Sequence, residues 1–251
     1  MGKITAQLQQ DGVMINDLDL LGFLAAAGDI SDFSVVNKFG QNNDLNSTTF
    51  EDIWDGGGLY SYPADGTAPI TKVDSSSASD TNTVEVQGLD IDGNLVVQTA
   101  TLTGTTPVTL TTPLWRVFRM KNNSDTDYVG TVQCVNDADD ATYAQIAIGN
   151  NQTLMALYTI PAGKTGYLVH GSAAISDNNR AVAASGRFLA RPYGGVFQLK
   201  ETFGLTDSSP YQHKYYLPFK APEKTDIRVQ CKGDANGVVV NATFAILLRD
   251  N

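Results

Sequence analysis

The chain has 251 residues, of which 42% are apolar and only 18% are charged, so uncharged polar residues and 23 glycines fill much of it. This composition suits exposed β-strands with tight turns, because Thr and aromatic residues favour strands and Gly supplies positive φ; it argues against a helical bundle. The net charge of −10 and isoelectric point of about 4.5 exclude the basic surface that DNA or anionic lipid requires.

Residues 1–36 predict an N-terminal arm that precedes any strand pattern. Apolar side chains at mixed spacing lead into three alanines and Gly28, which predicts either one short helix stopped by that glycine or an extended arm. The arm packs on its own domain or docks on a neighbouring subunit, and the sequence favours neither. No basic segment followed by an apolar core opens the sequence, so we expect no signal peptide, synthesis in a cytoplasm and no membrane anchor.

Residues 37–83 predict a segment rich in Gly and aromatic residues that serves as an interface. Aromatic residues flank three consecutive glycines, which predict a tight connection where the backbone closely approaches another group. Rigid rings supply contact area at little entropic cost, as interfaces favour. A phosphate loop would need a Lys-Ser/Thr pair between a strand and a helix, so we reject it. The candidate interface residues of the arm and this segment are Leu18, Leu21, Phe23, Leu24, Phe50, Trp54, Gly56, Gly57, Gly58, Leu59 and Tyr60.

Residues 84–251 predict a single β-sandwich domain. Apolar runs on either side of Asp90-Ile91-Asp92-Gly93-Asn94 predict a hairpin with Asp-Gly at its tip. Thr fills eight of the fourteen positions 99–112, in the alternation of a half-buried strand and its successor. From residue 84 onward the pattern predicts about eleven or twelve strands. The predicted fold class is therefore all-β, an antiparallel sandwich of jelly-roll type with an extended or short-helical arm.

Strands of this kind leave sheet edges that aggregate unless they are paired or covered. Association around a symmetry axis is a natural way to cover them. We therefore expect a homo-oligomer, with a trimer preferred.

Residues with catalytic or metal-binding chemistry are few, and none of them forms a known motif. His170 and His213 lie in no HExxH pair, and no GxSxG elbow is present, although a Ser-His-Asp triad assembled from distant residues stays open. A calcium loop starting at Asp90 would need Glu at its twelfth position, where Thr101 stands. We therefore expect no catalytic residue, no metal and no cofactor.

Two further alternatives concern the cysteines and the exposed rings. Cys134 and Cys231 lie in no CxxC motif; one bridge between them is possible, and two separate buried thiols are the favoured interpretation. Exposed aromatic residues on a sandwich could also stack on sugars, which would make the chain a glycan-binding protein, although sheet packing is the commoner role of strand tyrosines. The candidates for sugar stacking are Trp54, Tyr193, Tyr211, Tyr215 and Tyr216.

Four segments of the sequence together resemble a known group of proteins. They are NKFGQN (37–42), EDIWDGGGLY (51–60), VEVQGLDIDGNLVVQTATLTGTT (84–106) and YTIPAGKTGYL (158–168). Over about residues 37–170 the chain thus resembles virion structural proteins of tailed bacteriophages. The resemblance implies a non-enzymatic capsid decoration (cement) protein that binds the major capsid protein, or a fibre-associated protein of the tail, collar or baseplate with a possible host-glycan ligand. It implies a location in the virion, no cofactor and no direct contact with nucleic acid.

Overall fold

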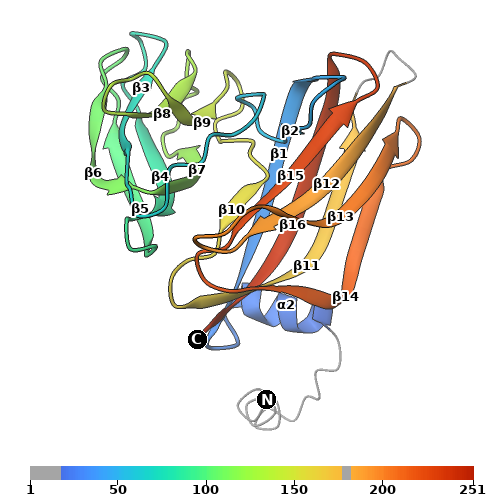
Figure 1. Cartoon of the computed structure of the whole chain (residues 1–251). Helices are drawn as coiled ribbons and strands as arrows, with labels where there is room; N and C mark the ends of the chain where they lie inside the picture. Colours follow the sequence, from blue (N-terminus) through green and yellow to red (C-terminus); the bar gives the residue numbers. More distant parts are fainter. Residues whose placement is uncertain (1–17, 177–181) are drawn as a thin grey trace.

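A computed structural model describes residues 18–176 and 182–251 of the chain, and these residues form a nearly all-β protein, as the sequence predicted (Figure 1). Every strand pairing is antiparallel, which confirms the predicted fold class. The elements are α2 (Leu18–Ala27), β1 (Phe33–Leu45), β2 (Glu51–Asp52), β3 (Ile70–Ser75), β4 (Thr83–Leu89), β5 (Leu95–Thr101), β6 (Val108–Leu114), β7 (Arg116–Asn122), β8 (Val132–Asn136), β9 (Thr142–Ile146), β10 (Leu157–Thr159), β11 (Lys164–Ile175), β12 (Ala183–Arg191), β13 (Gln198–Thr206), β14 (Tyr211–Ala221), β15 (Asp226–Gly233) and β16 (Val238–Asp250).

The strands form two lobes that lie side by side in Figure 1. The terminal lobe, residues 33–53 and 156–251, pairs a sheet of order β1-β16-β11-β14 with one of order β10-β15-β12-β13, and β2 adds to β15. The inserted lobe, residues 54–155, contains the sheets β6-β3-β8-β9 and β5-β4-β7. The terminal lobe and the inserted lobe each surround an apolar core, and Leu89, Trp115 and Phe118 of the inserted lobe pack into the core of the terminal lobe. The chain leaves the terminal lobe after β2 and returns at β10.

The expected boundaries at residues 36 and 83 both fall inside this arrangement. β1 runs across the first boundary and pairs with β16 along its length, and β3, which precedes the second, lies between β6 and β8 in the inserted lobe. The sequence analysis missed β1, β3 and β9 as strands, and thirteen strands lie in the described residues from Thr83 onward. The sequence pattern did not predict β1 because three of its four buried positions hold Lys38, Gly40 and Asn42 rather than apolar residues.

Two local predictions are confirmed by the backbone. Helix α2 ends where Gly28 adopts a φ of +80°, and Asp29 N donates to Leu24 O at 2.9 Å, the pattern of a glycine-capped helix end. The β4–β5 hairpin forms with Leu89 opposite Leu95, and Gly93 has a φ of +86° in its tip. The arm is therefore helical over the residues that the structure describes, and residues 1–17 lie outside them.

The two cysteines lie in different cores. Cys134 belongs to the inserted lobe and Cys231 to the terminal lobe, and both are buried free thiols. Burial raises the pKa of each thiol far above its usual range. Two separate thiols, the favoured interpretation of the sequence, are thus confirmed.

Candidate functional site

The glycine and aromatic segment that was predicted as an interface lies largely in the interior. The indole of Trp54 meets Tyr60 edge-on at 5.3 Å between ring centroids, Tyr60 meets Tyr62 at 4.7 Å, and Tyr62 meets Phe197 at 5.2 Å. Trp54 is 6% exposed and Tyr60 is 5% exposed, so these two rings offer almost no surface to a partner. The row of rings instead links the start of the inserted lobe to the loop before β13.

The three glycines serve this packing, as the sequence suggested. A Cβ on Gly56 would overlap the ring of Trp54, so only glycine lets the chain cross the indole here. Gly57 and Gly58 have φ values of +69° and +63°, which allow the chain to turn back toward β2. Of the neighbouring candidates, Leu59 is exposed and Phe50 is half-buried under the guanidinium of Arg187 at 4.0 Å.

The candidates in α2 are more accessible. Phe23 is 68% exposed, Leu21 and Leu24 are half-buried, and Ala25 is buried; the side chain of Leu18 is outside the described part of the chain. The helix carries one acidic residue and no basic residue in its ten positions. An apolar helix with an exposed Phe at its centre is a candidate contact surface.

A buried ionic network joins the two lobes. Arg116 of β7 donates through Nε and Nη2 to both carboxylate oxygens of Asp226 on β15, at 2.9 and 3.1 Å. Arg191 of β12 donates to the same carboxylate through Nε at 2.9 Å, and Thr159 Oγ1 donates to it at 2.6 Å. Arg116 is 2% exposed and also binds Asp65 at 3.1 Å. Since β7 belongs to one lobe and β12 and β15 to the other, this network holds the lobes together.

A second buried carboxylate supports the same junction. Asp52 of β2 is fully buried, accepts a hydrogen bond from Tyr60 N at 2.8 Å and lies 3.4 Å from Arg228 Nη1. Burial raises the pKa of Asp52, and the positive charge of Arg228 and the Tyr60 hydrogen bond oppose that rise. These hydrogen bonds and ion pairs join elements of both lobes, so we assign the junction a structural role.

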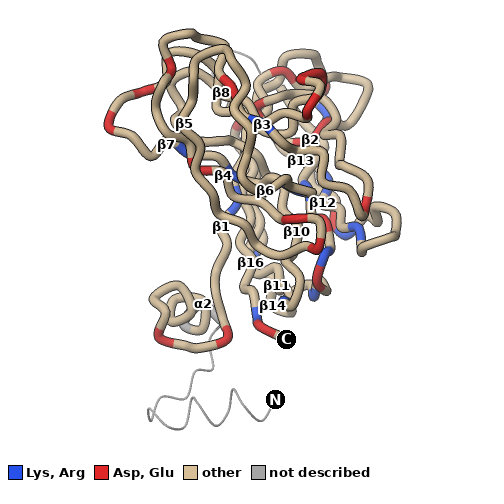
Figure 2. Tube along the Cα trace, turned by 90° about the vertical axis from the view of Figure 1, so that its left-hand side faces the viewer, with Lys and Arg blue, Asp and Glu red and all other residues tan. Residues whose placement is uncertain are grey.

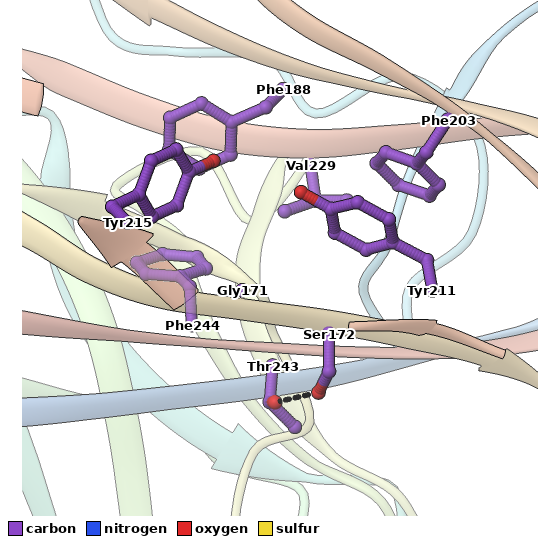
Figure 3. A pocket seen from close by; sticks show the side chains of 9 residues that line it. All are labelled: Gly171, Ser172, Phe188, Phe203, Tyr211, Tyr215, Val229, Thr243 and Phe244. Carbon is purple, nitrogen blue, oxygen red and sulfur yellow. Dashed lines mark hydrogen bonds between the residues drawn. The ribbon is translucent and has the colours of Figure 1, made fainter. Parts of the chain in front are cut away.

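Tyrosines of β14 close the open side of the sandwich, where β13 and β14 each end their sheet. Figure 3 shows rings from both sheets around a small cavity, with Phe203 stacked on Tyr211 at 4.2 Å. At its rim Glu201 accepts a hydrogen bond from Tyr215 and lies 2.8 Å from Nδ1 of His213. Burial, and secondly the Glu201 hydrogen bond, raise the pKa of Tyr215. Tyr215 is therefore a hydrogen-bond donor at neutral pH, and its ring helps to close the open side of the sandwich.

Beyond Tyr215 the β14 strand leaves the sheet in a wide bulge. Lys214 pairs with His170 and Phe219 with Leu168, so residues 215–218 stand opposite Val169 alone. This bulge carries Tyr216, 95% exposed, and Leu217, 82% exposed. Bulges at sheet edges interrupt pairing and redirect side chains, which is what happens here. Sequence analysis missed the bulge, because only the register with β11 reveals it.

The inserted lobe has an exposed apolar surface of its own. β5 forms the edge of its sheet and alternates strictly, with Leu95 and Val97 53% and 57% exposed on its outer side. Ile91, 51% exposed, lies in the adjoining hairpin turn. We call Ile91, Leu95 and Val97 the β5 surface.

Among the described residues, no group of three or more His, Cys, Asp or Glu side chains lies close enough together to hold a metal ion. Asp90 accepts from the backbone N of Asp92 at 2.9 Å and of Asn94 at 2.8 Å, so it fixes the hairpin turn that the sequence predicted. Among the described helices, none has the length and apolar character needed to cross a bilayer.

Comparison with known proteins gives little likeness. No family model and no curated protein matches the chain. A chain in the structure of the infectious bursal disease virus Gt strain is similar at 11% identity and a TM-score of 0.24, over 87% of this chain and 72% of that one. A mutant VP2 protein of infectious bursal disease virus in T=1 particles has 10% identity and a TM-score of 0.21, over 94% and 80% of the two chains. TM-scores this low define no common fold.

Proposed function

We propose that this chain is a non-enzymatic virion structural protein that acts as a capsid decoration (cement) protein, binding the major capsid protein and stabilising the head. The observation that carries the proposal is the pair of exposed apolar surfaces on separate lobes: the β14 bulge with α2 on one, and the β5 surface on the other (Figure 1). A protein that must bind both its own copies and a different partner needs two such surfaces. The sequence phrases shared with tailed-phage virion proteins indicate what kind of assembly this is.

The β5 surface is the proposed contact with the major capsid protein. Leu95 and Val97 are both more than half exposed on the outer side of β5, with Thr99 and Thr101 on the same side of the strand. Such a surface can pack against an apolar face of a partner. Each contact can be weak, because a trimer engages several sites at once and repetition over a shell multiplies the effect.

Copy number in purified particles tests the proposal directly. A decoration protein occurs in a fixed ratio to the major capsid protein, measurable on a quantitative gel of particles of the phage that encodes it. A handful of copies per particle would reject decoration. Loss of capsid binding by a Leu95→Ser/Val97→Ser variant, with the fold and oligomeric state unchanged, would assign the contact to the β5 surface.

A fibre-associated, glycan-binding role is the second candidate, and one observation favours it. Tyr193 is 49% exposed, packs edge-on against Trp115 at 5.6 Å between centroids, and has the ammonium of Lys224 5.3 Å from its ring. A ring held rigidly at the surface beside a cation suits stacking on an acidic sugar. Adhesion of the purified protein to host cells, lost in Tyr193→Ala, would support this role over decoration.

A further inference from the structure

We infer that copies of this chain associate through one patch on the outer face of the sheet β1-β16-β11-β14, where the β14 bulge of one copy enters a hollow on the next. The inference concerns self-association of the purified protein, so it stands or falls independently of the proposed place in a virion.

The projecting part of the patch is the bulge at residues 215–218. Tyr211 and Tyr215 point inward to the cavity between the sheets, so alternation along the strand places Lys214 on the outer face. In the bulge that follows, Tyr216 is 95% exposed and Leu217 is 82% exposed. These two large side chains form a knob that the described part of the chain leaves almost uncovered.

The receiving part of the patch is a hollow beside this knob. It measures about 270 Å³ and has mostly apolar walls, contributed by Gly22, Val35, Val169, His170, Lys214, Ala245 and Leu247. Its volume is several times the roughly 30 Å³ that one water molecule occupies in the liquid, so a large side chain fits. Val169 and Lys214 line the hollow and also border the bulge, which places knob and hollow next to each other.

Helix α2 extends the apolar area on the far side of the hollow. Gly22 lines the hollow, and there is empty space beside it, because no atom lies within 4 Å of the position that its Cβ would take. Phe23, the neighbouring residue, is 68% exposed. The apolar patch thus runs from α2 across the hollow to the bulge, and we call it the α2–β14 patch.

The distribution of charge suits this face to contact between copies, because each copy has a net charge of −10. The four strands of the sheet contain only two of the chain's 27 acidic residues, Asp44 and Asp250, both next to strand ends. Asp and Glu lie mainly in the connections between strands (Figure 2). Copies that meet through the α2–β14 patch therefore keep most of their negative charge apart.

The identity of the partner follows from the shape of the patch. A knob and a hollow that stand side by side can be complementary to a second copy of the same patch. When each bulge fills the hollow of another copy, in a two-fold pair or a closed ring, every knob and every hollow is buried. The trimer expected from the sequence would be one such ring, and no protein of other sequence is needed to cover the patch.

Sedimentation velocity of the full chain over a range of concentrations tests the inference, with three variants. In Tyr216→Ser/Leu217→Ser the knob is removed, and we expect the association constant to fall about tenfold or more. In Gly22→Leu the hollow is filled while the knob stays, and we expect a similar loss together with a slightly more stable helix. Leu95→Ser/Val97→Ser, which removes comparable apolar area from the β5 surface, should associate like the wild type.

Circular dichroism and thermal melting confirm that each variant is folded before sedimentation is interpreted. The inference is overturned if the wild type sediments as a monomer throughout, or if either α2–β14 variant associates like the wild type. It is also overturned if the β5 variant loses association equally, because the contact would then not be specific to this patch.

Discussion

The two aromatic segments of the chain, residues 50–62 and 211–219, each contain four Phe, Trp or Tyr residues, and their most and least exposed rings lie in different environments. Trp54 and Tyr60 of the first are 6% and 5% exposed, whereas Tyr216 of the second is 95% exposed. The first segment enters the space between the lobes, where Phe197 and the arginines of β12 and β15 complete its surroundings. The second runs along a sheet edge and ends in a bulge that no other strand covers. The number of aromatic residues in a segment therefore does not distinguish an interface from a core. Whether a ring is buried depends on which strands from distant parts of the sequence pack against it.

The largest expected loss of stability concerns the buried ionic network around Asp226, which lies next to the first segment. Replacing Asp226 by Ala leaves two guanidinium groups buried without their carboxylate, so we expect unfolding free energy to fall by about 3–5 kcal/mol. Chemical denaturation monitored by Trp fluorescence measures this loss. Asp250→Ala, which removes an exposed carboxylate paired with Lys164, is the matched control and should cost less than about 1 kcal/mol. Equal costs for the two variants would contradict the structural role of the junction.

Truncation of one ring in each segment should change the stability of the protein by very different amounts. Trp54→Ala opens a cavity in the inserted lobe and should cost about 3–5 kcal/mol, because the indole is buried against Tyr60 and Gly56. Tyr216→Ala removes only exposed surface and should change stability by no more than about 0.5 kcal/mol. Urea denaturation at a protein concentration below that of self-association measures both. A Tyr216 cost as large as that of Trp54 would show that the bulge packs within its own chain.

A pH-dependent effect of intermediate size comes from Asp55, which connects β2 to the inserted lobe. Burial raises the pKa of this carboxyl to about 7, and a hydrogen bond from Leu154 N opposes that rise. Between pH 4 and 7 the folded state holds a proton that the unfolded chain has released, so stability falls as pH rises through this window. Asp55→Asn should be more stable than the wild type by about 4 kcal/mol at pH 8 and equal to it at pH 4. A constant difference between the two proteins across this pH range would contradict the assignment.

The smallest expected change in stability concerns the turn formed by Gly56 and Gly57. Gly57→Ala places a side chain at a φ of +69° in open space, so we expect a cost of about 1 kcal/mol from backbone strain alone. Gly56→Ala should cost more, because its Cβ meets the buried Trp54 ring. Thermal melts of the two variants rank them, and the reverse order would mean that Trp54 moves aside freely.

The local features of the fold could be predicted from the sequence, whereas its long-range pairings could not. Gly28 and the Asp-Gly turn at residues 92–93 fix their backbone within a few residues, so the helix end and the β4–β5 hairpin were predicted. β1 pairs with β16 from Phe33 opposite Arg249, more than two hundred positions away. No local pattern encodes that pairing, and so the inserted lobe was not foreseen.

The candidate site was predictable to a similar degree. The apolar character of α2 is local, and Phe23 is exposed as a contact residue requires. The same reasoning selected Trp54 and Tyr60, which are interior because they belong to the apolar core of the inserted lobe. The β14 bulge depends on four residues, 215–218, that have no paired residue on β11, which only the assembled sheet reveals.

Hydroxyl-radical footprinting of the wild-type protein at low and high concentration tests the central claim most directly, since it reports both segments in one experiment. We expect Tyr216 and Leu217 to be oxidised readily in dilute solution and protected at high concentration, and Trp54 and Tyr60 to be protected in both. Oxidation of Tyr216 that is unchanged by concentration, or ready oxidation of Trp54 in the folded protein, would contradict the account.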